Sequence, residues 1–181
     1  LSLKSGGDAQ KIVSDLDGLP AGRQAQYIVQ SVEKSQVTRA PFAPFTTSTL
    51  QQDASKKLHL SSKQTMMFAQ QLYEAGYITY MRTDSLNVSA ESLAQAKAFI
   101  TGTFGASYHQ QHRYKTKSKS AQEAHEAIRP TVPSQEPETL KNTLTPAQLK
   151  LYDLIWRRFV SSQMSKAVFD ATTITINAIS S

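Results

Sequence analysis

The chain has 181 residues, a net charge of +6, 39% hydrophobic residues and no cysteine. This length can bury one good core or two small ones, and no apolar run approaches the roughly 18 residues that a membrane span needs. We therefore expect a soluble protein without a membrane partner; the lack of cysteine excludes disulfides and thiolate metal sites and makes the cytoplasm the default location.

The first forty residues predict a β-rich piece. Asp8 is expected to cap a short helix that ends by 18–20, and the β-branched content and rough alternation of 24–38 indicate an extended strand. Two prolines within 40–44 then interrupt regular structure, because proline removes a backbone donor and constrains the residue before it. We place a domain boundary there.

Helical patterns dominate the next stretch. A helix is expected from 47 or 48 to about 57, and Ser61 with Gln64 forms a capping-box pattern that opens a second helix. The second helix carries five large side chains, Met66, Met67, Phe68, Leu72 and Tyr73. We interpret its methionines as core filler and expect it to stop at Gly76.

Beyond that glycine, residues 78–81 are too few and too apolar for an amphipathic helix, so we expect a buried extended piece that leads out to Arg82. Ser89 is expected to cap a third helix that ends near 102–105. Its inward side chains should be Leu93, Ala96 and Ile100.

A basic stretch follows the third helix. No acidic residue occurs between Glu91 and Glu123, and five cations fill that interval: Lys97, Arg113, Lys115, Lys117 and Lys119. Four aromatic side chains accompany them, Tyr108, His109, His112 and Tyr114. This composition suits backbone phosphates and stacked bases of a nucleic acid. A solvated lysine-rich loop is the alternative interpretation.

The last third of the chain predicts two more elements. Residues 123–128 have room for about one helical turn before Pro130. Thr145, Pro146 and Gln148 combine an N-cap, an N1 proline and an N3 glutamine, and so predict a helix to about 163 with Trp156 in the core. The β-rich residues 168–176 are expected to pair with the early strand.

One short segment carries the chemistry. Tyr80 is a candidate nucleophile, Arg82 lies two residues on, and Thr83, Asp84 and Ser85 follow. Arginine offers planar, permanently charged donors for phosphate oxygens, whereas a phenol that attacks phosphorus must lose a proton with a pKa of ~10. The residue types alone also fit a core tyrosine beside a surface charge.

The amino-acid sequences of three segments resemble those of one protein family. Residues 76–85, Gly-Tyr-Ile-Thr-Tyr-Met-Arg-Thr-Asp-Ser, are similar to the active-site motif of type IA DNA topoisomerases. Residues 44–55 resemble the family's segment upstream of the nucleophile, and residues 121–131 resemble its downstream histidine motif. The three occur in family order, and the resemblance runs from about 42 to 164.

The resemblance implies an α+β architecture, in which a mostly helical domain carrying the tyrosine is inserted into a β-rich arch. Residues 1–40 and 167–181 would be pieces of the arch, and 41–166 the inserted domain. The family's nucleotidyl-transfer domain, with its acidic Mg²⁺-binding cluster, has no counterpart here. We therefore expect a fragment that is inactive alone, with Mg²⁺ bound by the missing domain and no metal site in this chain.

The resemblance also implies a reaction. Tyr80 would cleave single-stranded DNA by transesterification without ATP, keep the 5′-phosphate as a phosphotyrosine, and reseal the strand after another has passed, which relaxes negative supercoils. Arg82 matches the arginine that holds the scissile phosphate. His125 matches the family histidine, which would donate to phosphate or tune a nearby carboxylate. Thr83, Asp84 and Ser85 are expected to organise the loop.

Six further residues are predicted to contact DNA: Arg129, Lys115, Lys117, Lys119, Ser48 and Gln52. Helix capping explains Ser48 nearly as well, and Glu126 would repel DNA unless it is paired. Two alternatives remain: a nonenzymatic module that binds single-stranded DNA, and a tyrosine recombinase, which would need more arginine and histidine motifs upstream. The polarity of a trapped DNA adduct separates the two kinds of enzyme.

Overall fold

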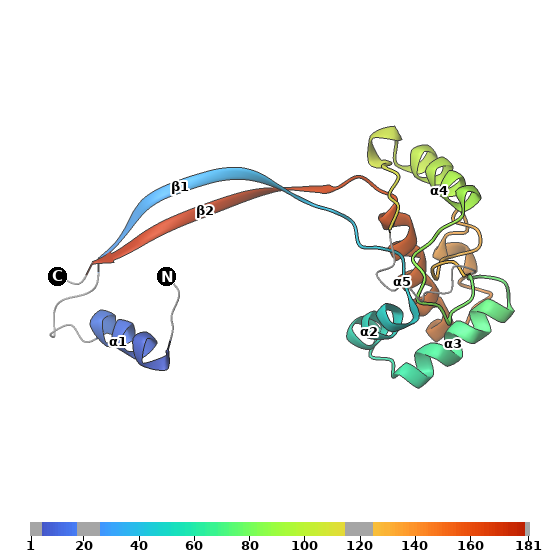
Figure 1. The fold of residues 1–181 in the computed structure, drawn as a ribbon, viewed down its shortest axis with the longest axis horizontal. Helices are drawn as coiled ribbons and strands as arrows, with labels where there is room; N and C mark the ends of the chain where they lie inside the picture. The colour runs from blue at the N-terminus through green and yellow to red at the C-terminus, as the bar shows by residue number, and fades with distance from the viewer. Residues whose placement is uncertain (1–4, 18–25, 115–124, 180–181) are drawn as a thin grey trace. The chain divides into compact units, whose positions relative to one another are not determined.

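The computed structural model describes residues 5–17, 26–114 and 125–179 (Figure 1). The chain divides into two compact units, one formed by Leu1–Thr38 with Val168–Ser181 and the other by Arg39–Ala167. Helices and a sheet both occur, so the predicted mixture of α and β structure is confirmed. Within the described ranges, no helix is both long and apolar enough to cross a membrane.

The first unit contains helix α1 (Gly6–Asp17) and the two strands β1 (Gln26–Arg39) and β2 (Ala167–Ile179). The strands pair in a two-stranded sheet, which confirms the predicted pairing of the early and late strands. Helix α1 begins two residues before Asp8, so the prediction that Asp8 caps it is wrong. Many apolar side chains of the sheet are exposed: Tyr27, Ile28, Val29, Val32, Val37, Val168, Phe169, Ile174 and Ile176.

The second unit is mainly helical. Its helices are α2 (Thr47–Leu58), α3 (Ser62–Glu74), α4 (Ala90–Thr103) and α5 (Pro146–Ser162), with short 3-10 helices η1 (Ala106–Tyr108) and η2 (Pro137–Leu140). Helices α2, α3 and α5 pack against one another, whereas α4 contacts η1 (Figure 1). Each of the four α-helices begins after a hydroxyl side chain that accepts a backbone N–H, at Thr46, Ser61, Ser89 and Thr145.

Burial in this unit follows the predicted helical faces, with one exception. Leu72, Ile155 and Phe45 are fully buried, and the Trp156 indole donates to the Pro133 carbonyl at 2.8 Å, which confirms the tryptophan as a core residue. Met67, however, is 48% exposed, so its interpretation as core filler is wrong. The position of Met67 in the helix does not by itself indicate that its side chain lines a groove on α3 together with Arg82.

An ion-pair cluster joins α2 to α5. The Arg158 guanidinium donates to Asp53 Oδ2 at 2.6 Å, and Lys57 Nζ donates to the same oxygen at 2.7 Å. The Cζ atom of Arg158 also lies 4.3 Å from the ring centroid of the fully buried Phe45. Burial by itself would raise the pKa of Asp53, but the Lys57 hydrogen bond and the two positive charges outweigh it and lower that pKa.

We expect Asp53→Asn to lower the free energy of unfolding by about 1–3 kcal/mol at neutral pH, because both cations lose a charged acceptor. Since the folded-state pKa of Asp53 lies below the ordinary 3.8, this contribution is complete above the ordinary pKa and is lost as the pH falls through the folded value. Urea unfolding, followed by tryptophan fluorescence at neutral and acid pH, measures both effects.

Asp153→Asn is the matched control for this substitution. Its partner Arg157 is 73% exposed, and solvent screens such a pair, so the variant should lose less than about 1 kcal/mol. Equal losses in the two variants, or a difference that persists unchanged in acid, would contradict the role given to Asp53.

Candidate functional site

The three segments with recognisable motifs lie side by side in the second unit. Residues 127–131 pair with residues 77–79 and also with Phe45, and Thr47 bonds to Thr83. Backbone hydrogen bonds of 2.8–3.0 Å join Ile128 N to Phe45 O, Thr79 N to Arg129 O, Thr131 N to Tyr77 O, and Thr47 N to Thr83 O. Residues far apart in sequence therefore share one small region.

The same contacts correct one prediction. Residues 125–128 are extended rather than helical, and Ile128 forms an antiparallel bridge to Phe45 while Pro130 bridges to Ile78. The helical turn predicted for 123–128 is therefore wrong over its described part. The backbone N–H and C=O groups of this segment bond to two segments that are distant in sequence, and such pairing cannot be predicted from the local sequence.

Two threonine side chains fix the backbone on both sides of Tyr80. Thr79 Oγ1 donates to Ala127 O at 2.7 Å and accepts from Arg129 N at 3.0 Å. On the other side, Thr47 Oγ1 donates to Met81 O at 2.7 Å, and Met81 is only 1% exposed. The position of Tyr80 is consequently set by hydrogen bonds to two other segments and by a buried neighbour.

The loop after Tyr80 is held by its own hydroxyl groups. Thr83 Oγ1 accepts from Ser85 N at 3.0 Å, and Ser85 Oγ accepts from Asn87 N at 3.1 Å. Both side chains are buried, at 7% and 1% exposure, whereas Asp84 is exposed. The prediction that Thr83 and Ser85 organise this loop is confirmed.

The ring of Tyr80 lies against two other aromatic side chains. Its centroid is 5.4 Å from that of His125, at an interplanar angle of 36°, and 5.3 Å from that of Tyr73, edge-on at 68°. Tyr80 and His125 are each half-buried, and Tyr73 is 40% exposed at the end of α3. The fold thus brings together two of the three residues predicted to be catalytic, and adds Tyr73, which sequence reasoning assigned only to the helix.

Arg82, the third predicted catalytic residue, is exposed and lines a groove of about 490 Å³ beside α2 and α3. The other lining residues are Gln51, Ser62, Lys63, Met66, Met67 and Gln70. In the described ranges Arg82 forms no ion pair, so its guanidinium is available to an external anion. Ser48 and Gln52 are exposed on α2, but neither is among the lining residues.

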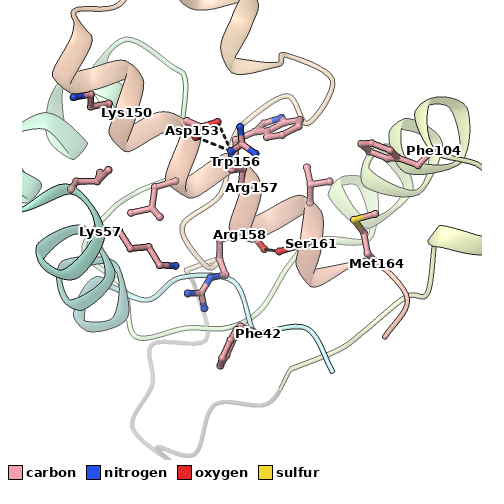
Figure 2. Close-up of a pocket in the computed structure, with 13 residues that line it drawn as sticks. Phe42, Lys57, Phe104, Lys150, Asp153, Trp156, Arg157, Arg158, Ser161 and Met164 are labelled. Carbon is pink, nitrogen blue, oxygen red and sulfur yellow. Dashed lines mark hydrogen bonds and ion pairs between the residues drawn. The ribbon is translucent and has the colours of Figure 1, made fainter. Parts of the chain in front are cut away.

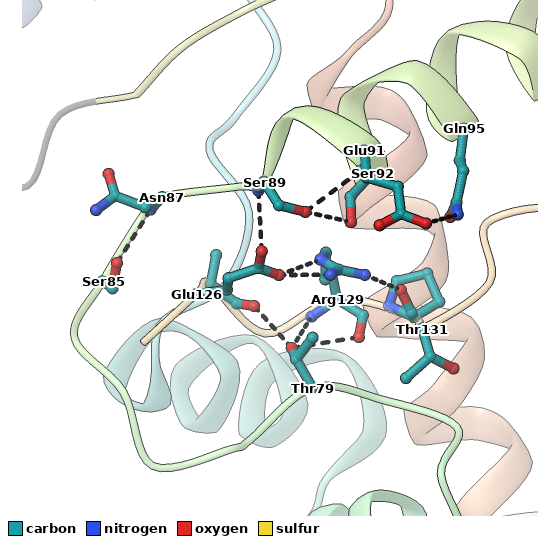
Figure 3. A network of polar contacts seen from close by, with 12 residues as sticks. Thr79, Ser85, Asn87, Ser89, Glu91, Ser92, Gln95, Glu126, Arg129 and Thr131 are labelled. Atoms are coloured by element: carbon teal, nitrogen blue, oxygen red, sulfur yellow. Dashed lines mark hydrogen bonds and ion pairs between the residues drawn. The ribbon is translucent and has the colours of Figure 1, made fainter. Parts of the chain in front are cut away.

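Arg129 is directed inward, as Figure 3 shows. It is 9% exposed, its Nε donates to Glu126 Oε2 at 2.7 Å, and its Nη1 donates to the Pro130 carbonyl at 2.9 Å. Glu126 Oε1 in turn accepts from the backbone N of Ser89, the N-cap of α4, at 3.0 Å. Glu126 is therefore paired, and Arg129 serves an internal contact; that it also contacts DNA stays a prediction.

The basic stretch is only partly described. Lys115, Lys117 and Lys119 lie outside the described residues. Tyr114, just before them, donates through its hydroxyl to Ser162 O at 3.0 Å and to Pro41 O at 3.3 Å, and burial raises its pKa. The DNA contacts predicted for the three lysines stay predictions.

His109 and His112 lie three residues apart next to the cations of this stretch. His112 Nε2 lies 3.0 Å from Met164 O, and burial, then the charges of Lys97 and His112, lower the pKa of His109. Across the described ranges, no three histidine, aspartate or glutamate side chains gather closely enough to hold a metal ion. These residues therefore do not fit a resident Mg²⁺.

Known proteins are similar to this chain over most of its length. The sequence pattern of the DNA topoisomerase family matches residues 2–181. A prokaryotic-type DNA topoisomerase 1 from Acanthamoeba polyphaga mimivirus is 51% identical over 155 residues, which are 85% of this chain and 18% of that protein. The structure of full-length topoisomerase I from Thermotoga maritima has a TM-score of 0.74 and 36% identity, and the match covers 97% of this chain and 29% of that one.

Proposed function

Because this chain belongs to the type IA DNA topoisomerase family, we propose that it supplies the nucleophile of an ATP-independent enzyme that changes DNA topology. The observation that carries the proposal is the arrangement around Tyr80. Its ring contacts His125, its backbone is fixed on both sides, and the exposed Arg82 lies two residues on, in a groove. A nucleophile, a hydrogen-bond donor for phosphate and, two residues along the chain, a phosphate-binding cation are thereby combined in one segment and its neighbour.

In the proposed reaction the Tyr80 oxygen attacks a phosphorus atom of single-stranded DNA. The phenol loses its proton, a new bond forms between Oη and phosphorus, and the bond from phosphorus to the 3′-oxygen breaks. That oxygen takes up a proton and leaves as a 3′-hydroxyl, while the 5′-phosphate stays on Tyr80. One ester replaces another, so resealing needs no ATP and follows the same path in reverse after a second strand has passed, which relaxes negative supercoils.

Arg82 and His125 have separate roles in this proposal. The Arg82 guanidinium binds the non-bridging phosphate oxygens, where negative charge grows as Oη attacks, and a fixed cation stabilises that charge more in the transition state than before it. His125, with its ring against Tyr80, donates a hydrogen bond to the same phosphate when its imidazole carries the required proton. The proton of Tyr80 and the leaving oxygen need further groups, which we assign to the rest of the enzyme.

The rest of the enzyme is expected to be large, because the chain spans 18% and 29% of the lengths of its two relatives. We propose that the unit Arg39–Ala167 is the inserted tyrosine-bearing domain and that β1 and β2 are parts of the arch. A Mg²⁺ requirement is consistent with the family. Since the described residues do not fit that ion, no step is assigned to it here.

The polarity of a trapped adduct tests this proposal. A single-stranded oligonucleotide labelled at one end is incubated with a protein that joins this chain to the missing domain, and the reaction is stopped with detergent. We expect a 3′-labelled strand to label the protein, because Tyr80 keeps the 5′-phosphate. Label transferred from the 5′ end would instead indicate a recombinase, and binding without any adduct would indicate a nonenzymatic DNA-binding module.

A further inference from the structure

A second cavity of about 590 Å³ lies on the side of α5, between α2, Phe42 and Phe104 (Figure 2). It shares no lining residue with the Arg82 groove, and neither Tyr80 nor His125 lines it. Its volume is typical of pockets that bind small molecules or single residues of a polymer, about 300–1,000 Å³. Nothing in the reaction at Tyr80 uses it.

The cavity combines an apolar floor with an exposed aromatic edge. Its apolar lining comprises Leu58, Leu154, Trp156, Val160 and Met164. Phe42 is 76% exposed and Phe104 is 45% exposed, although Phe104 packs edge-on against Phe99. The Arg158 guanidinium lies over the Phe42 ring, with its Cζ atom 5.0 Å from the centroid. Since Arg158 covers one face of Phe42, the rest of this exposed ring is the surface suited to stacking.

Positive charge surrounds this surface. Four cations line the cavity, Lys57, Lys150, Arg157 and Arg158, against one acidic residue. That residue, Asp153, pairs with Arg157, and Asp53 pairs with Lys57 and Arg158. Lys150 forms no ion pair with any residue that the structure describes. An anionic group is therefore the complementary ligand for at least one side of the cavity.

We propose that this cavity is a second binding site for single-stranded DNA, with a base stacked on the exposed Phe42 ring and a phosphate held by Lys150. Stacking surfaces beside cations are what proteins use to bind single strands without reading sequence. An acidic peptide would satisfy the cations but not the stacking surface. Tyr114 also lies near this place, because its hydroxyl donates to the carbonyl oxygen of Pro41, the neighbour of Phe42.

The proposal rests on the proposed function for the identity of its ligand, and it adds a role. Strand passage requires the enzyme to handle two strands, the one that is cut and the one that passes. The Arg82 groove would hold the first, because Arg82 lies two residues from Tyr80. The cavity at Phe42 offers a separate hold for the second strand, or for a distant part of the same one.

Trp156 makes the test direct, because it lines the cavity and is the only tryptophan in the chain. We expect a short oligothymidylate added to the 181-residue chain to quench its fluorescence in a saturable way. Phe42→Ala should weaken the apparent affinity on the order of tenfold, because it removes the stacking partner. Lys150→Ala should reduce the slope of log affinity against log salt by about 0.7, the value for one phosphate of a single strand.

Lys56→Ala is the matched control, since Lys56 is an exposed cation of α2 that does not line the cavity, and it should change neither affinity nor slope appreciably. Melting curves show whether each variant remains folded. The proposed site would be wrong if the oligonucleotide did not quench the fluorescence, or if Lys56→Ala and Lys150→Ala had equal effects. Quenching by an acidic peptide but not by the oligonucleotide would also contradict it. Adduct formation at Tyr80 is measured separately. Failure of DNA binding at the cavity can therefore be told apart from failure of the reaction at Tyr80.

Discussion

Replacing Tyr80 by phenylalanine in a complete enzyme that contains this chain is expected to abolish the covalent DNA adduct and to reduce relaxation by about 10⁴-fold or more, as loss of a nucleophile does. The expected effect depends on one atom, the phenolic oxygen of Tyr80. Phenylalanine keeps the ring that contacts Tyr73 and His125, so packing should survive while the attacking oxygen is lost. Detergent-trapped adducts and a gel assay of supercoil relaxation measure the two effects.

Tyr73→Phe is the matched control, because it removes a hydroxyl from the ring that lies edge-on to Tyr80. That variant should retain the adduct. An adduct that survives in Tyr80→Phe and disappears in Tyr73→Phe would show that the nucleophile was assigned to the wrong tyrosine. The isolated chain with Tyr80 intact should form no adduct until the missing domain is supplied.

Arg82→Ala in the same enzyme is expected to reduce the rate of cleavage by about 10²–10³-fold, because a fixed cation at the developing charge is lost. Arg82 is exposed and has no ion pair within the described ranges, so the melting temperature should stay unchanged. Arg82→Lys should recover only part of the rate, since an ammonium group cannot bind two phosphate oxygens in the planar manner of a guanidinium. Single-turnover cleavage of an oligonucleotide measures the rates.

His125→Ala belongs to the same experiment, with a reduction of about 10²-fold expected for the loss of a hydrogen-bond donor to the phosphate in the transition state. Its imidazole packs on Tyr80, so the substitution also removes a ring contact. His125→Gln separates the two effects, because glutamine can donate a hydrogen bond without being charged. A much lower melting temperature for Arg82→Ala or His125→Ala would reassign that residue to a structural role.

Local signals in the sequence predicted the helices well. The capping boxes at Ser61 with Gln64 and at Thr145 with Gln148 are both present, and Ser89 caps α4 as expected. These signals work because the side chain and the amide that it caps are three residues apart. No distant part of the chain has to be known.

The candidate site was less predictable, because its contacts join residues that are far apart in sequence. Thr79 and Thr47 resemble ordinary polar residues until residues 125–131 and 81–83 are brought beside them. Arg129 was predicted to contact DNA, and the sequence alone did not indicate its internal ion pair with Glu126. The local sequence around Arg158 likewise does not indicate that Asp53 and Phe45 lie next to it in the fold.

The hydrogen bonds of Thr47 and Thr79 determine how a mechanical force on the proposed phosphotyrosine is transmitted. A strand end attached to Tyr80 pulls on a segment that is anchored at both sides, to α2 through Thr47 and to residues 127–129 through Thr79. Because Met81 is also buried, we expect such a force to be transmitted to the core of the unit and not to be taken up by a loop alone. For the proposed reaction we therefore expect the attached DNA end to move together with the whole unit Arg39–Ala167.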